Sequence, residues 1–260
     1  MYPQNQKILS TNHHYGNPST RFSVEPQKFE TDHKKFELKA IGDDGHLIKS
    51  KERVQHHGEV FTPKWMVKKM LSEPAIQEKL HDLHATFFEP SAGEGAFLKE
   101  ILHQKLNYVD QISNKTTWKS NALWSLMSIY AIELLKDNLA RSKEAMMNIF
   151  VNHYQAFMQK SLSSKTDVYK SAKYVINLNI VQGNTLTYRN DDGKLITFSN
   201  WIPFGSKVER EIFTFKSLFN NSDANDIGAN EGQLSLFDDL ENSDDTSKQK
   251  IIITKVFRMG

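Results

Sequence analysis

The spacing of apolar residues in the middle of the chain predicts alternating strands and helices. Short apolar runs typical of buried strands occur at three places: residues 85–89, 128–134 and 179–183. Apolar residues at helical intervals occur in four further segments: residues 63–71, a stretch beginning at Ala96, residues 122–127 and residues 137–160. Strands and helices that alternate in this order favour an α/β fold with a parallel sheet.

Both ends of the chain lack this periodicity. Residues 1–50 are polar and rich in His, Asn and Lys, so we expect an N-terminal arm, with a hairpin predicted only at residues 36–48. Residues 221–250 are rich in Asn, Asp, Ser and Gly, which predicts an acidic, disordered linker. The apolar run IIITKVF within residues 251–260 predicts a closing strand. One globular domain is therefore expected over residues 51–220.

Turn and capping residues add two local predictions. An Asp-Asp-Gly sequence predicts a hairpin turn within residues 186–198. Thr62 is placed to cap the first helix, with Pro63 as its first helical residue.

The composition excludes several classes of protein. The 260 residues are 38% hydrophobic and contain no run of about 18 apolar residues, which excludes a membrane span. The first residues lack the apolar core of a secretory signal. Cysteine is absent, which excludes disulfides, thiolate metal sites and cysteine nucleophiles. We therefore expect a cytoplasmic protein without a membrane partner.

The charge is unevenly distributed along the chain. Residues 221–245 contain eight acids and no Lys or Arg, whereas the rest of the chain has 33 bases and 23 acids, a net charge of +10. A basic body suits a phosphate-rich partner such as DNA, because neutralised phosphates release counterions. An ordinary lysine-rich surface would have the same charge, and charge alone favours that reading.

A glycine-containing turn follows the first predicted strand. The sequence FFEPSAGEGAF places Glu89 at the strand end, then Gly93 and Gly95, and then the helix. Glycine lets the backbone approach a ligand closely, and the start of a helix offers unpaired N–H groups. A tight turn without a ligand has the same pattern, so this motif alone is a weak signal.

Two polar residues follow the second and third predicted strands. Glu133 ends the second strand, where an acid can accept the hydroxyl hydrogens of a ribose, or can simply interact with a helix dipole. Asn184 follows the third strand, where its amide could bind the edge of an adenine ring. Taken alone, Asn184 is better explained as a residue that stabilises a turn.

Together with GEVFTP at residues 58–63, these motifs resemble the S-adenosylmethionine-binding half of N6-adenine DNA methyltransferases of restriction–modification systems. The resemblance covers residues 58–186 and implies a Rossmann-like class I methyltransferase sheet. In that family the Phe-Thr-Pro motif and the Glu-Pro-Ser-Ala-Gly motif contact the methionine part of the cofactor. The acid after the second strand binds the ribose, and the motif after the third strand contacts the adenine. The implied contacts with S-adenosylmethionine are Phe61, Thr62, Glu89, Ser91, Ala92, Gly93, Gly95, Phe97, Glu133 and Asn184.

The chain departs from the family in two ways. Asn184 stands where Asp is usual, and an amide can still form a hydrogen bond with adenine. The catalytic Asn-Pro-Pro-Tyr motif is absent, since the chain contains no Pro-Pro pair. That motif accepts the hydrogens of the adenine amine and stacks a ring on the flipped base. The nearest sequence is NWIPF, with Asn200, Pro203 and Phe204 as weak catalytic candidates, and we favour a structural proline turn there, anchored by Trp201.

These departures lead to two hypotheses. The first is a cofactor-binding subunit of a split DNA adenine N6-methyltransferase, inactive until a partner chain supplies Asn-Pro-Pro-Tyr and recognition of double-stranded DNA. The second is a non-catalytic protein that binds S-adenosylmethionine or recruits others to DNA. A complete small enzyme is disfavoured, because about 55 residues after the NWIPF segment are too few for the rest of the sheet and a recognition domain. No metal site is expected.

One short peptide in the acidic stretch resembles a known docking motif. QLSLF at residues 233–237 is similar to the pentapeptide by which bacterial proteins bind the DNA polymerase sliding clamp. Packing of the same residues on a partner subunit or on the body of the protein is the alternative, and we favour it, since five-residue motifs recur by chance.

Overall fold

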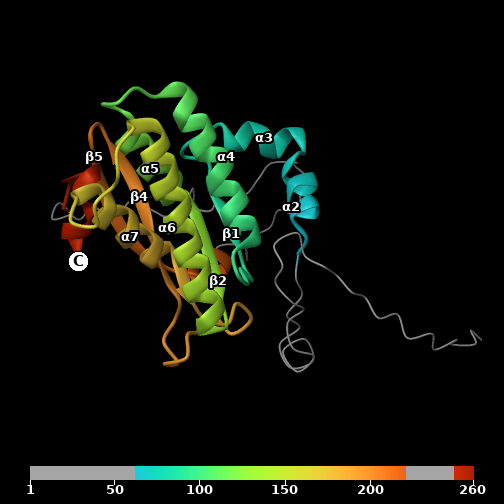
Figure 1. The fold of residues 1–260 in the computed structure, drawn as a ribbon. Helices are drawn as coiled ribbons and strands as arrows, with labels where there is room; N and C mark the ends of the chain where they lie inside the picture. Colours follow the sequence, from blue (N-terminus) through green and yellow to red (C-terminus); the bar gives the residue numbers. More distant parts are fainter. Residues whose placement is uncertain (1–61, 221–248) are drawn as a thin grey trace, which may run out of the picture. The chain divides into compact units, whose positions relative to one another are not determined.

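The computed structural model describes residues 62–220 and 249–260 (Figure 1). The predicted arm and its hairpin at residues 36–48 lie outside the described residues, as do Phe61 and the clamp-like peptide at residues 233–237. All but the last two residues of the predicted linker also lie outside them.

A parallel sheet of three short strands lies at the centre of the fold. Strands β1 (Phe87–Glu89), β2 (Ile129–Glu133) and β3 (Ile180–Gln182) are arranged in the order β1-β2-β3. Both pairs are parallel, which confirms the predicted strands and the mixed α/β class. Every residue of β2 is buried, as expected for the middle strand of a sheet covered on both faces.

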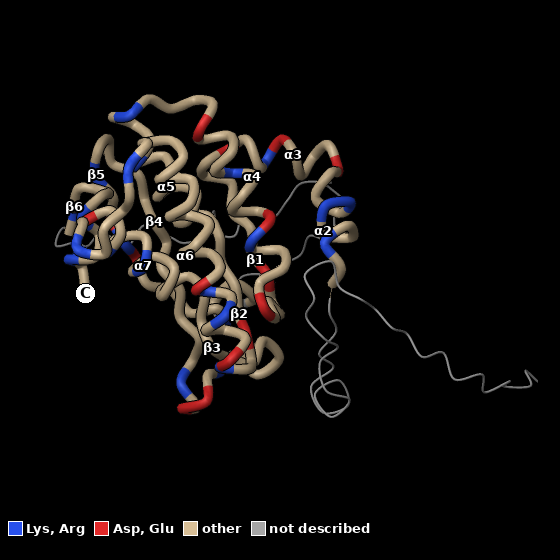
Figure 2. The backbone as a smooth tube through the Cα atoms, in the orientation of Figure 1, with Lys and Arg blue, Asp and Glu red and all other residues tan. Residues whose placement is uncertain are grey.

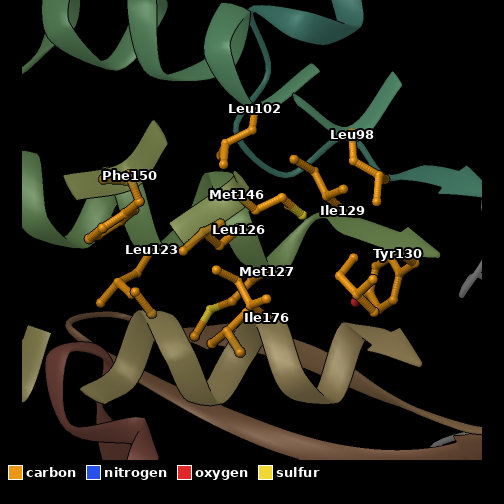
Figure 3. Packing of buried hydrophobic residues seen from close by; sticks show 14 of the residues in the cluster. Leu98, Leu102, Leu123, Leu126, Met127, Ile129, Tyr130, Met146, Phe150 and Ile176 are labelled. Carbon is orange, nitrogen blue, oxygen red and sulfur yellow. The ribbon is translucent and has the colours of Figure 1, made fainter. Parts of the chain in front are cut away.

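Helices connect and cover these strands. The described helices before β3 are α2 (Lys64–Leu71), α3 (Pro74–Leu80), α4 (Ala96–Ile112), α5 (Trp118–Met127), α6 (Lys136–Met158) and α7 (Asp167–Asn179). Helix α4 packs along α6, and α5 along α7, so that buried side chains of all four helices form one apolar cluster with β2 (Figure 3). Pro63 is the N-cap of α2, which therefore begins one residue later than predicted.

A second, antiparallel sheet packs on one face of the parallel sheet. It contains β4 (Thr197–Phe204), β5 (Lys207–Thr214) and β6 (Ile251–Ile252), in that order. The contacts that join the sheets include a hydrogen bond from the Tyr130 hydroxyl to the Ser199 carbonyl over 2.9 Å and the edge-on packing of the Phe88 ring against Phe198. Alternate residues of a strand point to opposite faces, so β2 presents Tyr130 to this second sheet.

The NWIPF segment is part of β4, so the predicted proline turn is wrong. Pro203 pairs with Val208 in the register of β4 and β5, and the reversal comes at Gly205, whose φ is +59°. Proline is tolerated here because β4 is an edge strand, in which a missing N–H leaves no neighbour unpaired. The predicted turn around Gly193 is present and is closed by a bridge between Arg189 and Leu195.

The end of the chain is mostly helical, so the predicted strand IIITKVF is largely wrong. Only Ile251–Ile252 forms a strand, and the 3-10 helix η1 (Ile253–Met259) follows. Ile253 and Val256 are both buried, and their spacing of three residues matches the three residues per turn of this helix. Helix η1 packs on α7, where the Ser171 hydroxyl donates to the Thr254 carbonyl.

The outer edge of β1 has no partner strand within the described part of the chain. The apolar segments 195–198 and 251–257, which could have covered that edge, lie beside β5 or α7. The short helix α8 (Ser217–Asn220) contacts β5. No helix among the described residues is both long and apolar enough to cross a membrane.

Candidate functional site

The three predicted cofactor motifs meet at the carboxyl ends of the parallel strands. Glu133 connects them: its side-chain Oε2 accepts from the N–H of Gly93 over 2.6 Å, and its carbonyl accepts from the N–H of Gly183 over 3.0 Å. The Thr185 hydroxyl donates to the Pro90 carbonyl over 2.6 Å. Segments about 40 and 90 residues apart in sequence therefore form one end of the sheet, where ligands bind in open α/β sheets.

The glycine turn depends on backbone conformations that favour glycine. Gly93 and Gly95 have φ values of +55° and +79°. A Cβ added to Gly95 would lie 2.9 Å from the Cβ of Ser142, so the turn packs tightly on α6. A Cβ added to Gly93 would meet nothing within 4 Å. The turn is thus crowded toward the helix and open at Gly93, as a surface that accepts a ligand requires.

Glu133 is buried at 4% exposure, and backbone groups already use part of its carboxylate. Besides the contact with Gly93, Oε1 accepts from the N–H of Leu135 over 2.9 Å, and the Asn138 amide lies 3.5 Å away. A carboxylate has about four acceptor positions, so it can hold the turn and still accept from a ligand hydroxyl.

Glu89 is a second acid at the same end of the sheet. Burial raises the pKa of its carboxyl, and the negative charge of Glu133 adds to this, while the N–H of Ser91, which donates to Glu89, opposes it. Two carboxylates close together, both of them removed from water in part, provide a site that favours a cationic or hydroxyl-bearing ligand.

Asn184 has the turn role expected from its sequence context. Its Oδ1 accepts from the N–H of Leu186 over 2.9 Å, which is an Asx turn, and its own N–H donates to the Arg189 carbonyl. The side-chain NH₂ takes no part in the Asx turn, so a donor remains for a ligand.

The other predicted cofactor contacts are divided between two places. Ser91 is exposed and Ala92 is buried in the glycine turn, and Phe97 lies half-buried in the first turn of α4. Thr62 lies instead in a cavity of about 390 Å³ beside α2, α4 and α6. The residues that line this cavity include Ala96 but neither Glu89, Gly93, Glu133 nor Asn184.

The weak catalytic candidates lie at the opposite end of the parallel sheet. Asn200 and Pro203 line a pocket of about 170 Å³ together with Thr86 and Ser128, which directly precede β1 and β2. Trp201, between them, is buried and donates from Nε1 to the Asn179 side chain over 3.0 Å. This contact supports the structural role predicted for Trp201. Phe204 is more than half exposed, with the Lys250 ammonium 3.9 Å from its ring centre.

One polar cluster was not predicted from the sequence. His103, His153 and Asp110 form a hydrogen-bonded chain between α4 and α6. The sequence feature that could have indicated this cluster is the spacing of His103 and Asp110, which lie two helical turns apart on one face of α4. No group of three or more His, Cys, Asp or Glu side chains in residues 62–220 and 249–260 is arranged to hold a metal ion.

Comparisons with known proteins identify no relative. No protein-family model, no curated protein and no solved structure matches the chain.

Proposed function

We propose that the chain is the S-adenosylmethionine-binding subunit of a DNA adenine N6-methyltransferase with a Rossmann-like class I sheet. The observation that carries the proposal is the hydrogen bond from Gly93 to Glu133, because it joins the glycine turn after β1 to the acid that ends β2. The contact of Gly183 with the same residue adds the third motif. The order of the three motifs along the chain and their meeting at one end of the sheet support this reading together.

The residues at this end fit the cofactor by their chemistry. S-adenosylmethionine supplies an activated methyl group on a sulfonium ion. The open space over Gly93 would admit the methionine part, and the Glu133 carboxylate would accept the ribose hydroxyls. The Asn184 amide would donate to the adenine ring, while Glu89 would favour the cationic part of the ligand.

The second candidate function is a non-catalytic protein that binds S-adenosylmethionine or recruits others to DNA. The observation that favours it is the position of Asn200, which lies at the amino ends of β1 and β2 rather than beside Glu133. The split enzyme remains our proposal, because its catalytic motif belongs to the partner chain.

Cofactor binding tests the proposal first. In Glu133→Gln, an NH₂ group replaces one acceptor oxygen, so a ribose hydroxyl loses its acceptor. We expect binding of S-adenosylmethionine to weaken by about 1–3 kcal/mol, measured by calorimetry. Glu94→Gln is the matched control: it removes one carboxylate charge from the glycine turn that contacts Glu133, but Glu94 faces Arg141 of α6. Equal affinity for the wild type and Glu133→Gln would show that Glu133, at the end of β2, does not bind the ribose.

Methyl transfer is the second test. The purified chain should transfer no methyl group from radiolabelled S-adenosylmethionine to duplex DNA. Activity should appear when a chain that carries Asn-Pro-Pro-Tyr, from a neighbouring reading frame, is added. Robust methylation by the isolated chain, lost in Asn200→Ala, would instead make NWIPF a catalytic motif. Cofactor binding without activity in any mixture would favour the non-catalytic candidate.

A further inference from the structure

A chain of hydrogen bonds crosses from the core to a cavity beside α2. The Trp118 indole donates to Oδ1 of Asp110 over 2.6 Å, and Oδ2 of Asp110 lies 2.7 Å from Nδ1 of His153. Nε2 of His153 lies 3.0 Å from Nδ1 of His103. Trp118 is fully buried, whereas His103 lines the cavity, so the chain has one anchored end and one open end. We call Asp110, His153 and His103 the histidine relay.

The partners determine which imidazole nitrogens carry protons. With His153 in its neutral form, Nδ1 donates to the Asp110 carboxylate and Nε2 is an acceptor. Nδ1 of His103 is then a donor, and Nε2 of His103 is left as the basic atom. Protonation of this Nε2 keeps both hydrogen bonds, and the Asp110 carboxylate at the far end stabilises the positive charge.

The cavity offers positive charge near His103. Its polar wall contains Thr62, Lys64, Lys99, Glu100 and His103, and its apolar part includes Ile149. Glu100 accepts from the Gln104 side chain over 3.0 Å but keeps its negative charge, so the two lysines of the wall exceed it by one charge. Figure 2 shows basic positions on α2, a helix without any acid. Of the lysines of α2, Lys64 lines the cavity, and Lys99 lies on α4.

The surroundings of His103 in the free protein disfavour the imidazolium. Burial and the neighbouring His153 lower the pKa of His103, as do Lys68 and Lys64, while Glu100 raises it. A bound anion would offset the effect of the two lysines on the pKa of His103 and would favour the imidazolium. The Asp110 carboxylate, at the far end of the histidine relay, stabilises the same positive charge. Anion binding and proton uptake at His103 are therefore linked.

We infer that this cavity is a binding site for a small molecule that carries a phosphate-type oxyanion next to a short apolar part. Lys64, Lys99 and protonated His103 would bind the anion, with the Thr62 hydroxyl as a further donor. The cavity shares Thr62 with the implied cofactor contacts, but Glu89, Gly93, Glu133 and Asn184 do not line it, so the inference does not depend on the proposed function.

Phenyl sulfate is a suitable probe, because its charge is constant between pH 6 and 8. Calorimetric titration of the full chain should show saturable binding that weakens by up to tenfold per pH unit across this range. Repeating the titration in buffers with different ionisation heats should show uptake of up to one proton per ligand. Glu133→Gln should bind phenyl sulfate as the wild type does, which separates this site from the cofactor site.

Two variants test the relay itself. His103→Gln should weaken binding at pH 6 at least tenfold and abolish both the pH dependence and the proton uptake. Asp110→Asn should weaken binding more at pH 7 than at pH 6, because it withdraws the charge that supports the imidazolium. His81→Gln is the matched control: His81 follows α3 outside the cavity, and this variant should behave as the wild type.

Three results would overturn the inference. The first is no saturable binding of phenyl sulfate at any of these pH values. The second is unchanged affinity and proton uptake in His103→Gln. The third is a response of the His103 ring nitrogens, followed by NMR, to duplex DNA but not to phenyl sulfate.

Discussion

Lys105 is the most unusual single residue in the described core. It lies in α4 and is fully buried, although lysine is rarely found there. Its ammonium donates to the carbonyls of Asp82 and Ala85 over 2.7 and 2.9 Å, and lies 5.2 Å from the centre of the Phe87 ring. The side chain thus ties α4 to the segment that leads into β1.

The burial of Lys105 makes the stability of the fold depend on pH. Burial lowers its pKa from 10.5 to about 7, so between these values the unfolded chain binds the proton that the folded chain has released. The free energy of unfolding should therefore rise with pH across this window, by up to about 1.4 kcal/mol per pH unit. Denaturant titrations at several pH values would measure it.

Two variants isolate the contribution of Lys105. Lys105→Met should lose the rise between pH 7 and 10, and should be less stable at pH 10 because two part-buried hydrogen bonds to carbonyls lose their donor. Lys79→Met, in exposed α3, should keep the rise. The same slope in wild type and Lys105→Met would show that the ammonium stays charged inside the fold.

Sequence reasoning found some residues of the site and missed others for a physical reason. Glu89 and Glu133 could be placed because the end of a buried strand in a parallel sheet has a defined position. Lys105 and the histidine relay could not, since a lysine or histidine on a helix is expected at the surface. Their roles come from segments 20 to 50 residues away, which no local pattern reveals.

At the scale of secondary structure, the contact between the glycine turn and α6 decides how the site is held. Gly95→Ala would add a methyl group 2.9 Å from the Cβ of Ser142, in a backbone conformation that alanine disfavours. We expect the free energy of unfolding to fall by about 1–2 kcal/mol from the conformation and by about 1–3 kcal/mol more from crowding. Chemical denaturation would measure the sum.

The chain offers a matched control for this substitution. Gly193 has a similar φ of +73°, but a Cβ there meets nothing within 4 Å, so Gly193→Ala should show the conformational cost alone. Gly95→Ala combined with Ser142→Gly should recover the crowding cost. Equal losses in Gly95→Ala and Gly193→Ala would mean that α6 yields easily and does not hold the turn.

The errors in predicting secondary structure also have physical causes. Pro203 suggests a turn in sequence, but an edge strand accommodates it, and the edge position of β4 is a property of the whole sheet. The run IIITKVF is rich in β-branched residues and predicts a strand, yet the buried surface of α7 selects a helix of three residues per turn. In both cases tertiary contacts override local preference.

At the scale of the whole molecule, the unpaired edge of β1 bears on assembly. Backbone groups at an exposed strand edge invite pairing with another chain. Within the described residues nothing pairs with that edge, and it borders the end of the sheet where Glu89 lies. Under the proposed function we predict a heteromer whose interface lies on the catalytic side of the proposed cofactor site and exceeds the ~1,200–2,000 Å² usual for stable complexes.

The C-terminal segment belongs to the stability of this chain rather than to that interface. A strand that follows a long acidic stretch could be delivered onto a partner, but β6 pairs with β5 and η1 packs on α7 of the same chain. Deleting residues 251–260 removes the buried side chains of Ile253 and Val256. We therefore expect the isolated chain to lose several kcal/mol of stability and to melt at a clearly lower temperature, before any partner is added.

A milder variant and a matched truncation complete this test. Val256→Ala should lower the free energy of unfolding by about 1–3 kcal/mol, because it opens a cavity under η1, whereas Arg258→Ala, on the exposed side, should not. Deleting residues 1–35 should leave the melting temperature unchanged.

If the chain without residues 251–260 melts like the wild type but no longer associates with the chain that carries Asn-Pro-Pro-Tyr, the segment serves the partner. If it melts early and still associates at low temperature, folding and assembly depend on different surfaces, which is the outcome we expect from the packing of η1 on α7.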